Sequence, residues 1–460
     1  MIAQGTSADR NLRWHCQRRL KALRHERASW EPHWRELSEH ILPRRGRFLW
    51  TANQGDGGRK LGGRIINAAG TLAVRTLASG MVSGITTPTR PWFRLTLSDR
   101  RLASLPSVRA WLDEVQAVLL RIFAASNFYN AIGTAYEELA VFGTAVIVVL
   151  EDYEDVVRFH TLTIGEYFLA ASHRGVVDTL YREFPLSIAA AVQEYGLDAV
   201  SRATADKYRA GRLDDEVTIV HAIEPNDRRV IEVPDAANMA WRSIHFESTS
   251  DDVSRSLLRV GGYRRFCVTG PRWSVTGNDV YGRSPGMDAL GDVKALQTME
   301  ADLARAVALM VKPPMVAPPS LRGSRATTLP GSITYVASAQ GTDQFRPAFT
   351  VSPRIEALQA SIDRRTRQIM ELFYADLFQM LSGMDGVQPR NAIEILERRE
   401  EKMLQLGPVL ERLHDELLDP LIRRVLEIAG NAATSERSIL PPRPAELDTP
   451  EFRSRELEDS

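Results

Sequence analysis

A long amphipathic stretch that ends at two prolines constrains the fold of this chain more than any other feature. Eight apolar residues recur three or four positions apart, the spacing of one helical face: Met287, Leu290, Val293, Leu296, Met299, Leu303, Val307 and Met310. The pattern predicts a helix of roughly 26 residues, about 40 Å long at 1.5 Å per residue. Pro313 and Pro314 follow Lys312, and proline cannot continue a helix. We therefore predict one long helix over residues 285–312 with a sharp end.

A second helix is predicted over residues 353–380, with an apolar set of Ile355, Leu358, Ile362, Ile369, Phe373 and Phe378. The segment between the two helices, 313–350, contains six prolines and short strand-like pieces. A short loop at 382–390 leads to a third helical tract over 391–430, in which Gly407-Pro408 and Pro420 predict bends. The order is therefore two helices around a proline-rich insertion, then a loop and a long helix.

The first 284 residues mix helices and strands. Helices are predicted over 10–42, with a break after Ser29 because Pro32 falls inside the pattern, over 65–87, and as a pair over 107–140. The apolar run 140–150 predicts a buried strand, and residues 90–95 predict an extended strand with Trp92 and Phe93 in the core. Short β-branched and aromatic segments then continue to about residue 282. Because these strands cluster, the fold class is α+β rather than a βαβ series.

The first predicted helix carries many cations: Arg10, Arg13, Arg18, Arg19, Lys21, Arg24 and Arg27. A contact with nucleic acid or with a scaffold protein is one interpretation. A solvated helix face is the interpretation that the charge pattern favours.

Composition and motifs argue against an enzyme. Lys+Arg and Asp+Glu are both 58, so the chain lacks the basic excess of a protein that grips DNA. The glycine-rich loop at 53–64 lacks the lysine and hydroxyl of a phosphate-binding loop, because Arg64 and Ile65 follow its last glycines. Acidic residues on the 285–312 helix alternate with Lys294 and Arg305, which indicates a solvated or subunit-facing surface. We predict no catalytic residue, no cofactor and no metal site.

Cysteines and hydropathy place the chain among proteins without disulfides or membrane spans. Cys16 and Cys267 are far apart and predict two reduced thiols. The N-terminal residues lack an apolar signal-peptide region. The longest apolar run, 140–150, is too short to cross a membrane.

Several separated blocks, in this order, resemble the head-to-tail connector (portal) proteins of short-tailed bacteriophages. They are SWEPHWRELSEHILPRRGRF, TLAVRTLASGMVSGITTPTRPWFRL, YEELAVFGTAVI, IGEYFLA, YGRSPGMDALGDVKALQ with its Pro-Pro stop, and NAIEILERREEKMLQLGPVLERLHDELLDPLIRRVL. The resemblance covers residue 30 to about residue 445.

The resemblance implies a portal fold with a helix and strand wing, a two-helix stem, a small proline-rich α/β clip and a short crown. It divides the chain into wing (1–284), first stem helix (285–312), clip (313–352), second stem helix (353–380), channel loop (381–390), long wing helix (391–430) and short crown or C-terminal tail (431–460).

The same resemblance implies a dodecameric ring at one capsid vertex, a conduit for DNA packaging and ejection. Implied partners are further copies of the chain, double-stranded DNA, the terminase large subunit, a tail adaptor, and the major capsid and scaffold proteins, with no membrane. The implied location is the virion, and the host cytoplasm during assembly. The alternative is another structural component of the virion, such as a tail adaptor or minor capsid protein.

The resemblance also implies site residues. The channel loop facing DNA comprises Ser382, Gly383, Met384, Asp385, Gly386, Val387, Gln388 and Arg390. On the second stem helix, Arg364, Arg365 and Arg367 either line the channel or form ion pairs between subunits. In the clip, Arg322 and Arg325 either meet the terminase or adaptor or lie in a solvated turn.

Overall fold

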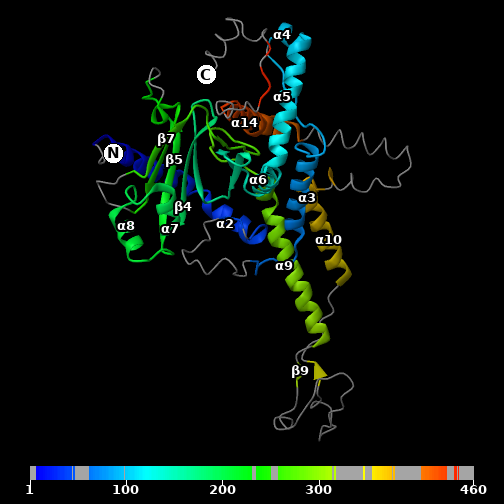
Figure 1. Cartoon of the computed structure of the whole chain (residues 1–460). Helices are drawn as coiled ribbons and strands as arrows, with labels where there is room; N and C mark the ends of the chain where they lie inside the picture. The colour runs from blue at the N-terminus through cyan, green and yellow to red at the C-terminus, as the bar shows by residue number, and fades with distance from the viewer. Residues whose placement is uncertain are drawn as a thin grey trace, which may run out of the picture.

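The computed structural model describes residues 7–43, 45–46, 62–97, 99–230, 235–249, 257–312, 315–316, 346–347, 355–375, 377–378, 406–431, 440–442 and 444. Within these residues the fold is α+β, with a sheet region beside a column of helices (Figure 1). None of the described helices is both long and apolar enough to cross a membrane.

The N-terminal helix breaks where the sequence predicts. Helix α1 spans Ser7–Arg27 and α2 spans Glu31–His40. Pro32 lies in the first turn of α2, where its missing N–H leaves no helical hydrogen bond unmade. Arg27, which is 7% exposed, donates to the carbonyls of Gly165 (3.0 Å) and Tyr167 (2.7 Å). The bend between the helices is therefore attached to the sheet region.

A five-stranded antiparallel sheet forms most of the strand-rich region. Its strand order is β3 (Tyr167–Ala171), β4 (Val177–Ser187), β5 (Glu216–Pro225), β6 (Trp241–Glu247), β7 (Arg259–Tyr263). Helix α1 packs on one face, burying Cys16, Leu20 and Leu23 against side chains that include Phe168 and Tyr181. The other face buries Ala191 of α7 (Ile188–Tyr195), and α8 (Arg202–Arg209) lies next to α7. The predicted clustering of short strands up to about residue 282 is confirmed, whereas α8 was not predicted.

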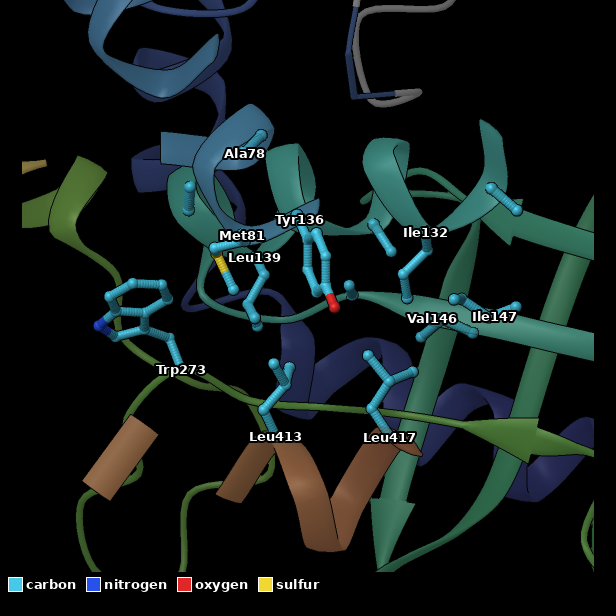
Figure 2. Packing of buried hydrophobic residues seen from close by; sticks show 14 of the residues in the cluster. Ala78, Met81, Ile132, Tyr136, Leu139, Val146, Ile147, Trp273, Leu413 and Leu417 are labelled. Carbon is cyan, nitrogen blue, oxygen red and sulfur yellow. The ribbon is translucent and has the colours of Figure 1, made fainter. Parts of the chain in front are cut away.

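The second sheet joins the helical column to the strands. Its order is β2 (Val156–Leu162), β1 (Val146–Asp152), β8 (Val268–Thr269). The helices of this part are α3 (Ala69–Gly84), α4 (Arg100–Ser104), α5 (Pro106–Ala125) and α6 (Phe128–Phe142). Figure 2 shows their shared core, in which Tyr136 and Leu139 of α6 face Leu413 and Leu417 from the C-terminal helices.

Two strand predictions in this region were wrong. The apolar run 140–150 is not one strand, because α6 continues to Phe142, Gly143 adopts a left-handed φ of 76°, and β1 begins at Val146. An apolar run buried on all sides has no period that separates helix from strand. Residues 91–97 belong to no strand. Trp92 nevertheless packs in the core as expected, stacked on Phe128 with 5.6 Å between ring centroids.

The long helices follow the predicted order. Helix α9 spans Pro285–Val311 and α10 spans Ile355–Leu372. The two ends of the insertion between them meet in a short antiparallel pair, β9 (Met315–Val316) with β10 (Arg346–Pro347). The described half of the third tract comprises α13 (Gly407–Leu413), a π-helical segment (His414–Leu418) and α14 (Asp419–Asn431). Pro408 and Pro420 each fall in the first two residues of a helix, so both predicted bends coincide with helix starts.

Two backbones cross in van der Waals contact where α6 turns into β1. A Cβ on Gly282 would lie 2.2 Å from the Gly143 carbonyl oxygen, and a Cβ on Gly143 would lie 2.3 Å from the Gly282 carbonyl oxygen. Thr144 Oγ1 accepts a hydrogen bond from the Gly282 N–H (2.8 Å), and the Gly143 carbonyl accepts one from the Trp273 N–H (2.9 Å). Both glycines are therefore required by the approach of the chains.

We expect Gly282→Ala to lower the free energy of unfolding by about 1–3 kcal/mol, because the new methyl group has no room beside the Gly143 carbonyl. The matched control is Gly291→Ala in α9, where an added Cβ meets nothing within 4 Å. This control should raise stability by roughly 0.5–1 kcal/mol, because alanine favours helix. Denaturant unfolding measures both, and equal stability of the two variants would contradict the close crossing.

Candidate functional site

The start of α9 is fixed by the YGRSPG segment. Ser284 caps the helix, since its Oγ accepts from the Met287 N–H (3.1 Å) and donates to the Val141 carbonyl (2.6 Å). Pro285 occupies the first turn. A Cβ on Gly286 would lie 2.8 Å from the Val141 carbonyl oxygen. The segment therefore sets both the first residue of α9 and its close contact with the end of α6.

The first half of α9 is held on two further sides. Gln297 is 7% exposed, and its Oε1 accepts from the N–H groups of Ile66 (2.6 Å) and Asn67 (2.8 Å). Glu300 accepts from Asn67 Nδ2 (2.7 Å), and Lys294 pairs with Glu36 of α2 (3.1 Å). The polar face of α9 is thus engaged in contacts within the subunit. Across the described residues, no three His, Cys, Asp or Glu side chains lie together as metal ligands.

Helix α10 packs against α9 and α3. Its Ile362 and Ile369 are buried in the same core as Leu290 and Val293 of α9. Arg365 forms an ion pair with Asp292 of α9. Figure 1 shows the upper part of α9 beside α10, while the end of α9 continues alone away from the molecule. The pair is therefore rigidly attached to the body at one end only.

The three predicted stem arginines differ in environment. Arg364 and Arg367 are exposed, whereas Arg365 is partly buried and paired with Asp292 of the same subunit. The exposed face of α10 also carries three acidic residues, Glu356, Asp363 and Glu371. This face is close to neutral because its three acids are balanced by the two exposed arginines to within one charge. The predicted loop residues 382–388 and Arg390, and the clip residues Arg322 and Arg325, lie outside the described residues.

A buried ion pair joins the C-terminal helices to the body. Arg272 is 4% exposed, and its guanidinium binds Glu416 of the π-helical segment through Nη2–Oε1 (2.6 Å) and Nε–Oε2 (3.1 Å). The Arg272 backbone N–H donates to the same carboxylate (3.0 Å), and Nη2 also donates to the Gly175 carbonyl (2.7 Å). Sequence reasoning missed this pair, because no local pattern links residues 144 positions apart.

Burial raises the pKa of several acidic groups in the body. Burial raises the pKa of both thiols, Cys16 and Cys267, to about 12, so neither is a ready nucleophile. Both are free, as the sequence predicts. Burial raises the pKa of Glu138 to about 7, although it accepts hydrogen bonds from Thr163 Oγ1 and the Ile164 N–H. These groups contribute to packing and local hydrogen bonding.

We expect Arg272→Met to destabilise the protein by about 3 kcal/mol, because the partly buried Glu416 would lose its two-point ion pair and keep only the partly exposed Arg412 (3.3 Å) as a cationic partner. Amide hydrogen exchange in residues 407–431 should accelerate. Replacing both partners, as Arg272→Met with Glu416→Leu, should recover much of the loss.

The control is Arg423→Ala, which removes an exposed i, i+4 pair with Asp419 in the same tract. Its effect should be below about 1 kcal/mol. Similar exchange rates in Arg272→Met and Arg423→Ala would show that the Arg272–Glu416 pair does not hold the tract.

Comparison with known sequences gives matches along most of the chain. The family model described as "Bacteriophage head to tail connecting protein" matches residues 13–453. The chain is 44% identical over 426 residues to the "Probable portal protein" of Bordetella phage BPP-1, covering 92% of this chain and 75% of that protein. It is 42% identical over 412 residues to the "Portal protein" of Salmonella phage epsilon15, covering 89% and 73%.

Comparison with solved structures gives weaker similarity. A chain from "Virion of native gene transfer agent (GTA) particle" matches with a TM-score of 0.28 and 12% identity, covering 84% of this chain and 93% of that one. The matches in sequence decide the assignment. The chain belongs to the bacteriophage head-to-tail connecting (portal) protein family, whose members are structural, non-enzymatic components of the virion.

Proposed function

We propose that this chain forms a dodecameric ring at one capsid vertex. The ring is the conduit for DNA during packaging and ejection, and it docks first the terminase large subunit and then a tail adaptor. Family membership and the exposed half of α9 support this proposal.

The distal half of α9 carries the proposal. From residue 301 onward no residue of the helix is buried, and Val307, Met310 and Val311 are 41%, 48% and 71% exposed. Their i, i+3, i+4 spacing places them on one face. Contiguous exposed apolar surface on a soluble protein marks an interaction site. Equivalent helices of neighbouring subunits, related by rotation about one axis, would bury this face and enclose a tube.

The near-neutral face of α10 suits a wall along which DNA slides. Many basic contacts would hold phosphates tightly, whereas a few allow transient interaction. Arg364 and Arg367 are the exposed arginines of this face and are proposed to touch phosphate. Ion pairs with acids of a neighbouring subunit are the alternative role for the same two side chains. Arg365 is already paired within its subunit.

The remaining assignments follow the family layout. The region up to 284 and the tract 391–430 would form the wing, 285–312 and 353–380 the stem, 313–352 the clip, and 431–460 the short crown. The clip would carry Arg322 and Arg325 toward the terminase or adaptor. Residues 381–390 would face DNA. The antiparallel pairing of β9 with β10 supports the clip assignment, because it closes the insertion at the ends of the two stem helices.

Electron microscopy of the purified protein should show closed rings with a central hole near the width of duplex DNA. Changing Val307 and Met310 together to Asp should abolish the rings and leave the circular dichroism of the subunit unchanged, since both side chains are already exposed. Arg305→Ala, in the same part of α9 and 74% exposed, should leave ring assembly intact. Monomers under all conditions, or rings that persist in the double Asp variant, would oppose the proposal.

The proposed channel loop has its own test. Asp385→Ala combined with Gln388→Ala should reduce DNA packaging or retention, because polar groups facing DNA are lost, while rings form normally. A packaging assay with the assembled particle measures the effect, and microscopy measures ring formation. Loss of rings in this variant would show that residues 382–390 hold the assembly together instead.

A further inference from the structure

Helix α1 has an inner row of cations that already have hydrogen-bond or ion-pair partners. The Arg13 guanidinium donates to the Glu247 carbonyl (3.1 Å), Arg24 pairs with Glu183, and Arg27 pairs with Glu31 (2.8 Å). His15 lies 3.3 Å from Glu224. Part of the basic character that the sequence shows is therefore used to attach α1 to the five-stranded sheet.

The opposite face of α1 carries a second row, which we call the outer stripe. It comprises Arg10, Trp14, Arg18, Lys21 and His25, spaced by four, four, three and four residues, and all five are exposed. Trp14 is 60% exposed, and the Arg18 guanidinium carbon lies 5.2 Å from its ring centroid. Within the described residues, no carboxylate pairs with Arg10, Arg18 or Lys21.

This combination is suited to binding an acidic polypeptide. Exposed Trp and Arg are the side chains most enriched where proteins bind one another. Three uncompensated cations along one face attract an anionic partner. The Trp14 ring adds an apolar surface between the charges, which a partner with scattered apolar residues can cover.

The chain itself contains a segment of matching charge. Residues 446–460 include six acidic and two basic side chains, a net charge of −4, together with Leu447, Phe452 and Leu457. They lie outside the described residues. Shortly before them, Pro441 is held against α5 by a hydrogen bond from Trp111 Nε1 to its carbonyl (3.2 Å). Fifteen residues can span up to about 50 Å when extended. We propose that residues 446–460, of the same or a neighbouring subunit, dock on the outer stripe of α1.

Duplex DNA suits the stripe less well. Carboxylates of the sheet flank α1, among them Asp178 and Glu183, and a phosphate backbone laid along the helix would be repelled by them. Helix α1 also lies at the sheet end of the molecule, away from the projecting end of α9 (Figure 1). A narrow polypeptide can follow one helical face and avoid the flanking acids.

A zero-length carbodiimide cross-link in the full-length protein tests the contact. Lys21 is the only lysine of the stripe, so docking predicts an amide between Lys21 and a carboxylate of residues 446–460, identified by mass spectrometry. Lys21→Arg removes the cross-link while keeping the charge. Lys294, paired with Glu36, reports general reactivity. Mixing isotope-labelled and unlabelled subunits assigns the segment to its own or a neighbouring subunit, and either result upholds the proposal.

Trypsin provides an independent readout, because Arg453 and Arg455 are cleavage sites within the segment. Arg18→Glu with Lys21→Glu should accelerate cleavage there about fivefold or more, and Trp14→Ala should accelerate it less. The matched control is Arg264→Glu with Arg265→Glu, an exposed pair that directly follows β7, which should leave the rate of cleavage unchanged.

Three results would overturn the proposal: equal cleavage rates in both double variants, a cross-link from Lys21 only to residues outside 446–460, or protection of Lys21 by duplex DNA. Docking within one subunit can be detected without ring formation, and docking between subunits needs only that two subunits associate.

Discussion

The crossing of residues 141–144 with residues 281–286 determines how the rest of the molecule is arranged. At this point α6 ends, β1 begins and α9 starts, all within one set of backbone contacts. Gly143 and Gly282 allow the two chains to touch, and Ser284 and Gly286 connect the first turn of α9 to the Val141 carbonyl. A helix of 27 residues that projects from the body needs a base whose orientation cannot vary. Close-packed backbone provides this more firmly than side chains, because it has no rotamers to exchange.

The same segment also fixes the C-terminal helices. Residue 271 accepts a hydrogen bond from the Ala145 N–H (3.1 Å), Arg272 binds Glu416, and the Trp273 N–H donates to Gly143. Three successive residues therefore join the α6–β1 corner to the tract that follows the proposed channel loop. A buried ion pair adds little net free energy to folding, but separating its two charges inside the protein costs several kcal/mol, about 3–5 when one partner is removed. This makes Arg272 suited to fixing the position of the C-terminal tract relative to the base of α9.

The sequence predicted those features of the fold whose signal lies within a few neighbouring residues, and it did not predict features that depend on distant residues. The sequence predicted the 285–312 helix, the break near Pro32 and the order of the helices around the proline-rich insertion. These features follow from the spacing of apolar residues and from the positions of prolines, which are patterns within a few residues of the chain. The run 140–150 was misassigned, because its burial on all sides removed the period and only the left-handed Gly143 marks the boundary. The Arg272–Glu416 pair and the intrasubunit pairing of Arg365 could not be inferred, since both depend on residues brought together by the whole fold. In the proposed channel wall, the sequence does not show which of the three arginines are exposed. The packing of α10 against α9 leaves Arg364 and Arg367 exposed and Arg365 partly buried.

The zero net charge of the chain arises from local compensation rather than from a lack of charged surfaces. On α10, three acids and two arginines share one exposed face. On α1, Arg24 and Arg27 are paired with carboxylates of the sheet and of α2, whereas the cations of the outer stripe have no such partner among the described residues. Screening limits an exposed charge to interactions within about 10 Å at ordinary ionic strength, so the overall balance says little about any single surface. One surface of a protein can therefore be close to neutral, as a wall along which DNA slides would be, while another surface carries enough positive charge to bind an acidic polypeptide. In Figure 1, α1 lies away from the projecting end of α9, so the proposed docking surface and the proposed channel wall are on different parts of the molecule.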